Sequence, residues 1–102
     1  MKKYRLSEED YWRMYREQDG RCALCARATG QSKRLAVDHD HSCCPKTPTC
    51  GQCTRGLACS VCNHHVIGEI ARDDPDFFRR GYIHLTNGSA KRLGIVSRGD
   101  GE

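Results

Sequence analysis

Four consecutive residues hold the densest group of reactive side chains in this chain. They place two carboxylates beside two imidazoles: Asp38, His39, Asp40 and His41. If this segment is extended, alternate side chains point to opposite faces, whereas a sharp bend would bring them together. Burying four such groups for structural reasons alone would cost much free energy. The residues by themselves leave three interpretations open: an exposed polar loop, a metal site or a catalytic site.

The eight cysteines form a second chemical pattern. There are three Cys-x-x-Cys pairs and one adjacent pair: Cys22/Cys25, Cys50/Cys53, Cys59/Cys62 and Cys43/Cys44. A Cys-x-x-Cys turn presents two sulfurs to one metal ion, and two such turns complete a closed tetrahedral zinc site. The chain opens on charged residues and not on an apolar secretion signal, which predicts a cytoplasmic location where thiols stay reduced. The cysteines therefore predict structural zinc rather than disulfides.

The grouping of the cysteines is predicted from what each zinc ion would hold together. The first and last pairs would clamp the first predicted helix to the helix after the last pair: Cys22, Cys25, Cys59 and Cys62. The inner four could hold a second zinc ion that orders the loop between them: Cys43, Cys44, Cys50 and Cys53. Because adjacent ligands are geometrically awkward, His41 is an alternative to one of the adjacent cysteines.

The composition is that of a small chain that needs such metal sites. Its 102 residues allow one domain, and only 37% of them are hydrophobic, so a large self-sufficient core is not expected. The formal net charge is +4. Each zinc ion with four thiolates carries a net charge of about −2, so two such sites cancel that excess. Attraction to nucleic acid must then come from local Arg and Lys patches. No apolar run approaches the ~20 residues of a membrane span, so no membrane contact is expected.

The segments that must position these side chains alternate between helical and extended patterns. A helix is predicted from about Ser7, its N-cap, to Gln18, with an apolar stripe along one side. Short strands are predicted at 35–38 and 57–58 on either side of an irregular loop at 42–54. Helices are predicted at 59–70 and 74–85, and a flexible C-terminal tail at 86–102. The expected fold class is a small α+β domain stapled by zinc.

Together these motifs resemble those of one nuclease family. From Tyr11 to Leu85 the chain is similar to the phage recombination endonuclease VII branch of the HNH, or ββα-metal (His-Me finger), endonucleases. The motifs that carry the resemblance are Cys22-Ala-Leu-Cys25, Asp38-His39-Asp40-His41, Arg55-Gly56-Leu57 and Cys59-Ser-Val-Cys62-Asn63. The resemblance implies a ββα-metal core with flanking helices in a domain of residues 1–85. It also implies that the first and last cysteine pairs share the structural zinc.

The resemblance further implies a metal-dependent DNA endonuclease. Asp38 and Asn63 would hold one Mg²⁺ or Mn²⁺ at the scissile phosphate, since hard ions prefer oxygen ligands. His39 would act as the general base that takes a proton from the attacking water, a task suited to imidazole at neutral pH. Hydrolysis of the phosphodiester bond would leave a 5′-phosphate and a 3′-hydroxyl, through nicking or another step of phage DNA processing.

Three more residues would support this reaction. His41 would contact the phosphate, Arg55 would bind DNA backbone phosphates, and Asp40 would orient a histidine. DNA is therefore the expected partner, and a homodimer or phage packaging proteins are further candidates. Sequence preference should be weak and binding salt-sensitive, because no base-reading motif is visible.

Two departures from the family pattern limit what is inherited. The branched-DNA resolvase of this family has a glutamate three residues after the Asn, where this chain has Val66, so metal binding or rate should differ unless His64 or His65 substitutes. The simpler interpretation of these two histidines is that they are exposed helix residues near the DNA. That resolvase also uses a longer C-terminal helical region to dimerise, so junction resolution is not implied here. The alternative from another class is a non-catalytic zinc module that binds DNA or a protein. A binding module has no need of the Asp38, His39 and Asn63 trio.

Overall fold

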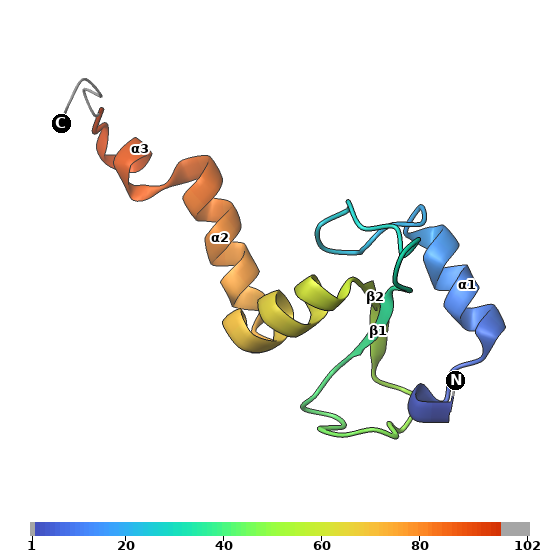
Figure 1. The fold of residues 1–102 in the computed structure, drawn as a ribbon. Coiled ribbons are helices and arrows are strands. Elements are labelled where there is room, and N and C mark those ends of the chain that lie inside the picture. The colour runs from blue at the N-terminus through green and yellow to red at the C-terminus, as the bar shows by residue number, and fades with distance from the viewer. Residues whose placement is uncertain (1, 97–102) are drawn as a thin grey trace.

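The computed structural model describes residues 2–96, in which a two-stranded sheet lies between helical segments (Figure 1). In chain order the elements are η1 (Lys2–Tyr4), α1 (Glu8–Glu17), β1 (Ala36–His39), β2 (Thr54–Ala58), η2 (Val61–Ile70), α2 (Pro75–Asn87) and α3 (Ser89–Leu93). The strands β1 and β2 are antiparallel. The long connections before β1 and between the strands carry two of the cysteine groups, so the sheet lies next to both.

The helix α1 begins and ends where capping chemistry predicts. The Ser7 hydroxyl accepts a hydrogen bond from the Asp10 backbone N–H at 3.0 Å, which satisfies a donor that the first turn leaves free. At the other end, Gly20 adopts a left-handed φ of 69° and donates its N–H to the Tyr15 carbonyl at 2.8 Å. The helix predicted from Ser7 to Gln18 is confirmed, and these two residues are its caps.

The hydrophobic core is small and lies between α1 and the sheet. Its buried members are Tyr11, Cys22, Leu35, Val37, Leu57, Ala58 and Cys62. Tyr11 is fully buried, and its hydroxyl donates to the Leu35 carbonyl oxygen at 2.6 Å, so the polar end of the ring has a partner. Two of the core residues are cysteines of the first and last pairs. Apolar packing and the cysteine pairs therefore meet in the same part of the molecule.

Gln18 joins the end of α1 to β2. Its Oε1 accepts from the Leu57 N–H, and its Nε2 donates to the Leu57 carbonyl oxygen, each at 2.9 Å. The Ala23 N–H donates to the same carbonyl at 3.0 Å. These bonds satisfy backbone groups of β2 that face α1 rather than β1, so this side of the short strand is not left as an open edge.

Two element boundaries differ from the sequence-based prediction. β2 begins at Thr54, earlier than expected, because a bulge lets it continue pairing with β1. The helix expected at 59–70 begins at Val61 and is π-helical: the Ala71 N–H, for example, donates to the Val66 carbonyl five residues back at 2.8 Å. Single turns of this wide type are frequent at functional sites, and here the whole helix adopts it.

The C-terminal part is more helical than expected. α2 starts with Pro75 after the N-cap Asp74 and extends to Asn87, and α3 follows directly. The expectation of a flexible tail from residue 86 is thus corrected for residues 86–93, because Gly88 joins two helices and Gly94, with a φ of 68°, caps the second. Residues 97–102 of that predicted tail lie outside the described residues.

The helices α2 and α3 form an arm that projects from the rest of the molecule (Figure 1). Its exposed apolar side chains include Tyr82, Leu85 and Leu93, which are 70%, 85% and 72% exposed. Within residues 2–96, no helix has both the length and the apolar character needed to cross a membrane.

The bridge between Gln18 and β2 gives a stability prediction. Gln18→Met keeps the length of the side chain but removes the donor and the acceptor, so the Leu57 N–H loses its partner. We expect the free energy of unfolding to fall by about 1–3 kcal/mol, measured by denaturant titration. Arg16→Met, on the exposed side of the same helix, is the control and should change the stability by less than about 0.5 kcal/mol. Equal stabilities of the two variants would contradict this role for Gln18.

Candidate active site and zinc centres

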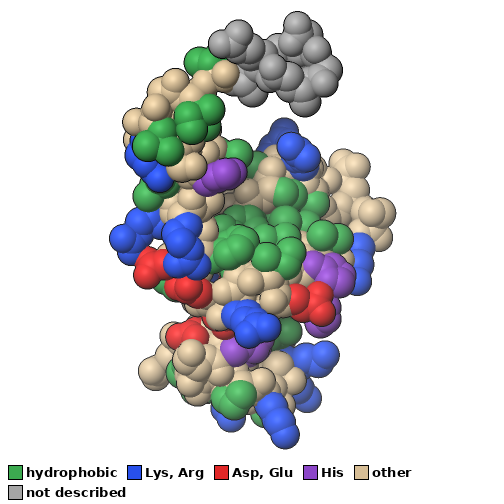
Figure 2. All heavy atoms as spheres, turned by 90° about the vertical axis from the view of Figure 1, so that its left-hand side faces the viewer, with side chains coloured by type: hydrophobic (Ala, Val, Ile, Leu, Met, Phe, Trp, Pro, Cys, Tyr) green, Lys and Arg blue, Asp and Glu red, His purple; other side chains and the backbone are tan. Residues whose placement is uncertain are grey.

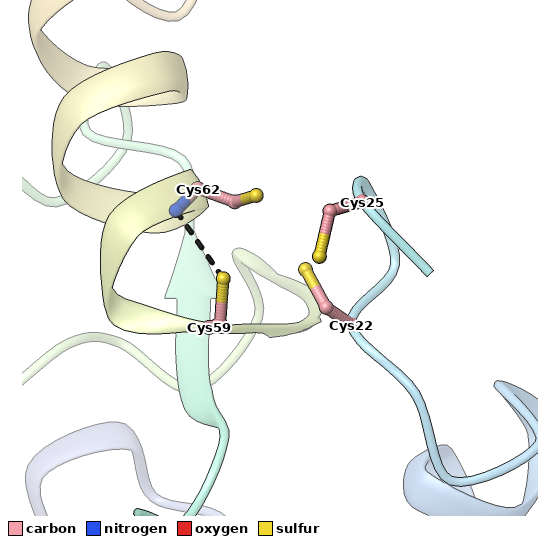
Figure 3. Close-up of side chains that lie close together, drawn as sticks. All are labelled: Cys22, Cys25, Cys59 and Cys62. Atoms are coloured by element: carbon pink, nitrogen blue, oxygen red, sulfur yellow. Dashed lines mark hydrogen bonds between the residues drawn. The ribbon is translucent and has the colours of Figure 1, made fainter. Parts of the chain in front are cut away.

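The first and last cysteine pairs come together as one tetrad, which we call the outer tetrad (Figure 3): Cys22, Cys25, Cys59 and Cys62. Their Sγ atoms all lie within 4.8 Å of one another. One pair comes from the loop after α1, and the other lies between the end of β2 and the first turn of η2. The predicted grouping is therefore observed, and the tetrad can hold a structural zinc ion.

Backbone N–H groups in these turns point at the sulfurs. Three N–H···S bonds of 3.4 Å occur: Leu24 to Cys22, Arg27 to Cys25 and Cys62 to Cys59. Hydrogen bonds from the backbone of Ala28 and Arg27 lower the pKa of Cys25 to about 6. Burial, with hydrogen bonds to Cys59 and Cys22, raises the pKa of Cys62 to about 12. Zinc binding would deprotonate the thiols, and the N–H···S bonds favour that charged form.

The four remaining cysteines form a second group, the inner tetrad: Cys43, Cys44, Cys50 and Cys53. Their Sγ atoms also lie within 4.8 Å of one another. The Cys50 N–H donates to the Cys44 Sγ at 3.2 Å, and the Gln52 N–H donates to the Cys50 Sγ at 3.4 Å. Both adjacent cysteines belong to the group, and His41, the alternative ligand, faces Asp73 instead. The inner tetrad can therefore hold a second structural zinc ion.

The chain bends sharply after β1, which ends at His39. Oδ1 of Asp40 accepts from the Ser42 N–H at 2.9 Å, and its carbonyl oxygen accepts from the N–H of Cys43 at 3.1 Å. The bend brings the rings of His39 and His41 to a centroid separation of 4.4 Å. Of the two arrangements that the sequence left open, the bend is the one observed, and Asp40 shapes it through backbone contacts.

Asp38 is bound on both of its oxygens by Arg55. Nε lies 2.8 Å from Oδ2, and Nη2 lies 3.0 Å from Oδ1, a bidentate geometry that suits the two groups. Asp38 pairs with Gly56 and His39 pairs with Thr54, so Arg55 is the extra residue of the bulge in β2. The bulge thus aims the guanidinium at Asp38, which is only 7% exposed. This pairing holds the pKa of Arg55 above its ordinary value.

Asp73 completes the cluster and was not predicted from the sequence. Its Oδ1 accepts from Arg55 Nη2 at 3.1 Å, and its Oδ2 accepts from His41 Nδ1 at 3.0 Å and from the His41 backbone N–H at 3.3 Å. Burial alone would raise the pKa of Asp73, but the hydrogen bonds from His41 and Arg55 outweigh it and lower the pKa below its usual value.

The backbone at Asp73 has an unusual conformation that helps to place the Asp73 carboxylate beside Arg55 and His41. Arg72 and Asp73 both have left-handed φ angles, of 52° and 59°, although neither is glycine. Two consecutive residues in this region are strained, and such strain persists where surrounding contacts hold it. Here the strained turn between η2 and α2 brings a carboxylate back to the end of β1. The sequence predicts only a turn before Pro75 and does not indicate that Asp73 contacts His41 and Arg55.

Asn63, in the first turn of η2, has a buried Oδ1 without a hydrogen-bond partner among residues 2–96. It lines a cavity of about 340 Å³ together with Lys33 and His64. Asp38 lines a different cavity, of about 360 Å³, with Arg55. The structure thus brings together Asp38, His39, His41 and Arg55, while Asn63 lines a separate cavity. A buried oxygen without a hydrogen-bond donor can still accept a hydrogen bond or bind a cation.

One face of the molecule carries charges of both signs. Figure 2 shows the side of the molecule from which the arm projects, with hydrophobic side chains at its centre and Lys, Arg, Asp, Glu and His side chains around them. The cavity at Asp38 has the same mixed character, because its wall also includes Leu24, Ile67 and Phe78. On this face, attraction to an anionic partner must therefore come from individual cationic side chains.

Comparison with known proteins covers most of the chain. The family described as Recombination endonuclease VII matches residues 1–87. The Gene 59 protein of Mycobacterium phage L5 is 44% identical over 90 residues, which are 88% of this chain and 49% of that protein. The Gene 59 protein of Mycobacterium phage D29 is 43% identical over 82 residues, which are 80% of this chain and 44% of that protein. The chain spans about half the length of these relatives. No solved structure matches it.

The two tetrads should differ in what they contribute. We expect two zinc ions per chain by elemental mass spectrometry, because each tetrad offers four sulfurs to one ion. Cys22→Ser should unfold the chain, since its zinc is shared with the core and structural zinc contributes folding free energy directly. Cys43→Ser should lose one zinc ion and keep a cooperative thermal transition by circular dichroism. A native-like melt of zinc-free Cys22→Ser would contradict this division.

Proposed function

Because this chain belongs to the recombination endonuclease VII family, whose members are nucleases that act on DNA, we propose that it is a metal-dependent DNA endonuclease of the HNH, or ββα-metal, type. The observation that carries the proposal is the pair of buried residues at the end of β1. Asp38 and His39 are each only 7% exposed, and they lie beside Arg55 and His41. Buried ionisable side chains gathered at one place are typical of functional sites.

Asp38 and Asn63 are the proposed ligands of one Mg²⁺ or Mn²⁺ ion, and because they line separate cavities in this structure, one ion can bind both only if the two side chains approach each other. Both offer oxygen, which hard cations prefer, and the buried Oδ1 of Asn63 has no donor among the described residues. Leaving such an oxygen without a partner costs about 1–3 kcal/mol, so a cation there would offset an existing penalty. When bound, the ion would supply stabilisation of negative charge at the scissile phosphate and the leaving oxygen.

Arg55 donates hydrogen bonds to two carboxylates of the cluster at once, Asp38 and Asp73. Its guanidinium now occupies both oxygens of Asp38, so cation binding at Asp38 requires the guanidinium to move away. Asp73 already accepts one of its hydrogen bonds and gives it a second anchor. From that anchor Arg55 would bind a DNA phosphate, because its planar fork matches phosphate oxygens.

His39 is the proposed general base, and His41 the proposed phosphate contact. The bend at Asp40 places the two rings together, so a phosphate near His41 would put its attacking water near His39. Transfer of the water proton to the imidazole would accompany attack on phosphorus, and the bond to the 3′ oxygen would break. General base catalysis of this kind contributes about 10²–10⁴-fold to a rate.

Contacts to the DNA backbone have a candidate location near the N-terminus. Lys2, Lys3 and Arg5 line a cavity of about 580 Å³ together with Thr47 and Pro48 of the inner-tetrad loop. Three cationic side chains there suit phosphate groups, and binding that depends on them should weaken as salt increases. The proposal extends to nicking or another step of phage DNA processing. A second copy of the chain and phage packaging proteins are the further partners that it includes.

The central test is cleavage of supercoiled plasmid. The purified protein should nick or linearise the plasmid with Mg²⁺ or Mn²⁺ and should be inactive with EDTA. His39→Ala should lower the rate by at least about 10²-fold, because the proton acceptor is lost, while zinc content and DNA affinity stay unchanged. His84→Ala, an exposed histidine of α2, is the matched control. Absence of cleavage by folded, zinc-loaded protein would favour a non-catalytic zinc module that binds DNA or protein.

A second test concerns Asp73. Asp73→Asn removes the charge that anchors Arg55 and holds His41, and we expect the cleavage rate to fall about tenfold, equivalent to ~1.4 kcal/mol in the barrier. Asp76→Asn, an exposed carboxylate at the start of α2, is the control with the same chemical change. The cleavage rates of both variants are measured on plasmid at several salt concentrations. Equal cleavage rates of the Asp73→Asn and Asp76→Asn variants would contradict a role for Asp73 in the reaction.

A further inference from the structure

We propose that the inner tetrad positions His39: it holds the Cys44 carbonyl group against one nitrogen of the imidazole and thereby fixes which nitrogen can accept a proton. The inference rests on the proposed function in one respect, the role of His39 as general base. The positioning itself can be observed without any cleavage. It gives the inner tetrad a task at the active site in addition to ordering its own loop.

The contact between His39 and Cys44 defines the state of the ring. His39 Nε2 lies 3.0 Å from the Cys44 carbonyl oxygen. A carbonyl oxygen can only accept a hydrogen bond, so Nε2 must carry the hydrogen. In the neutral imidazole the lone pair is then on Nδ1, since the bond made by one ring nitrogen sets the state of the other. Nδ1 is therefore the proton-accepting atom.

The position of that carbonyl depends on the inner tetrad. Residues 40–53 contain no helix or strand in the structure, so regular backbone pairing does not fix them. Cys44 is held by its N–H bond to the Asp40 carbonyl at 3.1 Å and by the Cys50 N–H bond to its sulfur at 3.2 Å. One metal ion bound to the four sulfurs would tie both ends of residues 43–53 together. Without it, the sulfurs are held together only by weak contacts such as that between the Cys43 and Cys50 Sγ atoms at 3.7 Å.

The inner tetrad is separate from the main core, so its effect on His39 can be distinguished from folding. The hydrophobic cluster includes cysteines of the outer tetrad but none of the inner four. Cys43 and Cys50 are exposed. The loop is also anchored at the N-terminus, where the Thr49 N–H donates to the Lys3 carbonyl at 2.7 Å. Loss of the inner metal should therefore loosen the Cys44 carbonyl while the core remains folded.

The tautomer of His39 can be measured directly by NMR. In protein labelled with ¹⁵N-histidine, two-bond proton–nitrogen correlations show which ring nitrogen carries the hydrogen. We expect zinc-loaded wild-type protein to hold His39 in a single Nε2–H form. In Cys43→Ser/Cys50→Ser, with only the outer zinc retained, His39 should exchange between forms, and plasmid cleavage should fall about tenfold or more. Ser42→Ala, in the same exposed loop, is the control and should resemble the wild type.

Two further variants keep the test decisive. Cys43→His offers a nitrogen ligand in place of sulfur. Unlike the serine variants, it should bind the second zinc ion and hold His39 in a single tautomer. If the double variant does not retain its outer zinc, Cys43→Ser alone replaces it. An Nδ1–H form in the wild type, or an unchanged tautomer after loss of the second zinc, would overturn the proposal. If the tautomer depends on the tetrad but wild-type protein does not cut DNA, the positioning stands and only the nuclease function fails.

Discussion

The convergence of the four sulfurs of the outer tetrad is the constraint on which the rest of the structure depends. It joins the loop after α1 to the junction between β2 and η2, segments that are far apart in the sequence. Two of its members are also core residues, so metal binding and apolar packing fix the same contact. A core this small leaves little free energy after the entropy of chain ordering, and a zinc ion held by the tetrad would supply what packing alone does not.

Once the sheet is fixed, short irregular segments build the site around the end of β1. The bulge in β2 brings Arg55 to Asp38, the bend at Asp40 brings the two histidine rings together, and the strained turn before α2 brings in Asp73. Each contribution comes from a position where regular structure ends or is interrupted. This is a common solution in small proteins, because such positions can aim a side chain without disturbing the core.

Features carried by local chemistry could be predicted from the sequence, and features carried by long-range contacts could not. The cap at Ser7 depends only on neighbouring residues, and the cysteine grouping depends on spacing that metal geometry restricts. The contacts of Asp73 depend on the path of η2, and nothing in the residue pattern distinguishes a π-helix from an α-helix. The hydrogen bonds between Gln18 and Leu57 could not be predicted from the sequence either, since any polar residue could end the helix. The roles of Asp38, His39 and Asn63 stay predictions that the resemblance suggested.

The two hydrogen bonds from Arg55 to Asp38 have a consequence for the cation binding proposed at this carboxylate. A nearly buried carboxylate without a counterion would be expensive, and the guanidinium supplies that charge from within the chain. A cation that binds Asp38 as proposed would have to displace the Arg55 guanidinium, so its apparent affinity would be weaker than the oxygen ligands alone would give. Under that proposal, Arg55 would compete with the cation for Asp38 and set the cation concentration at which the site fills.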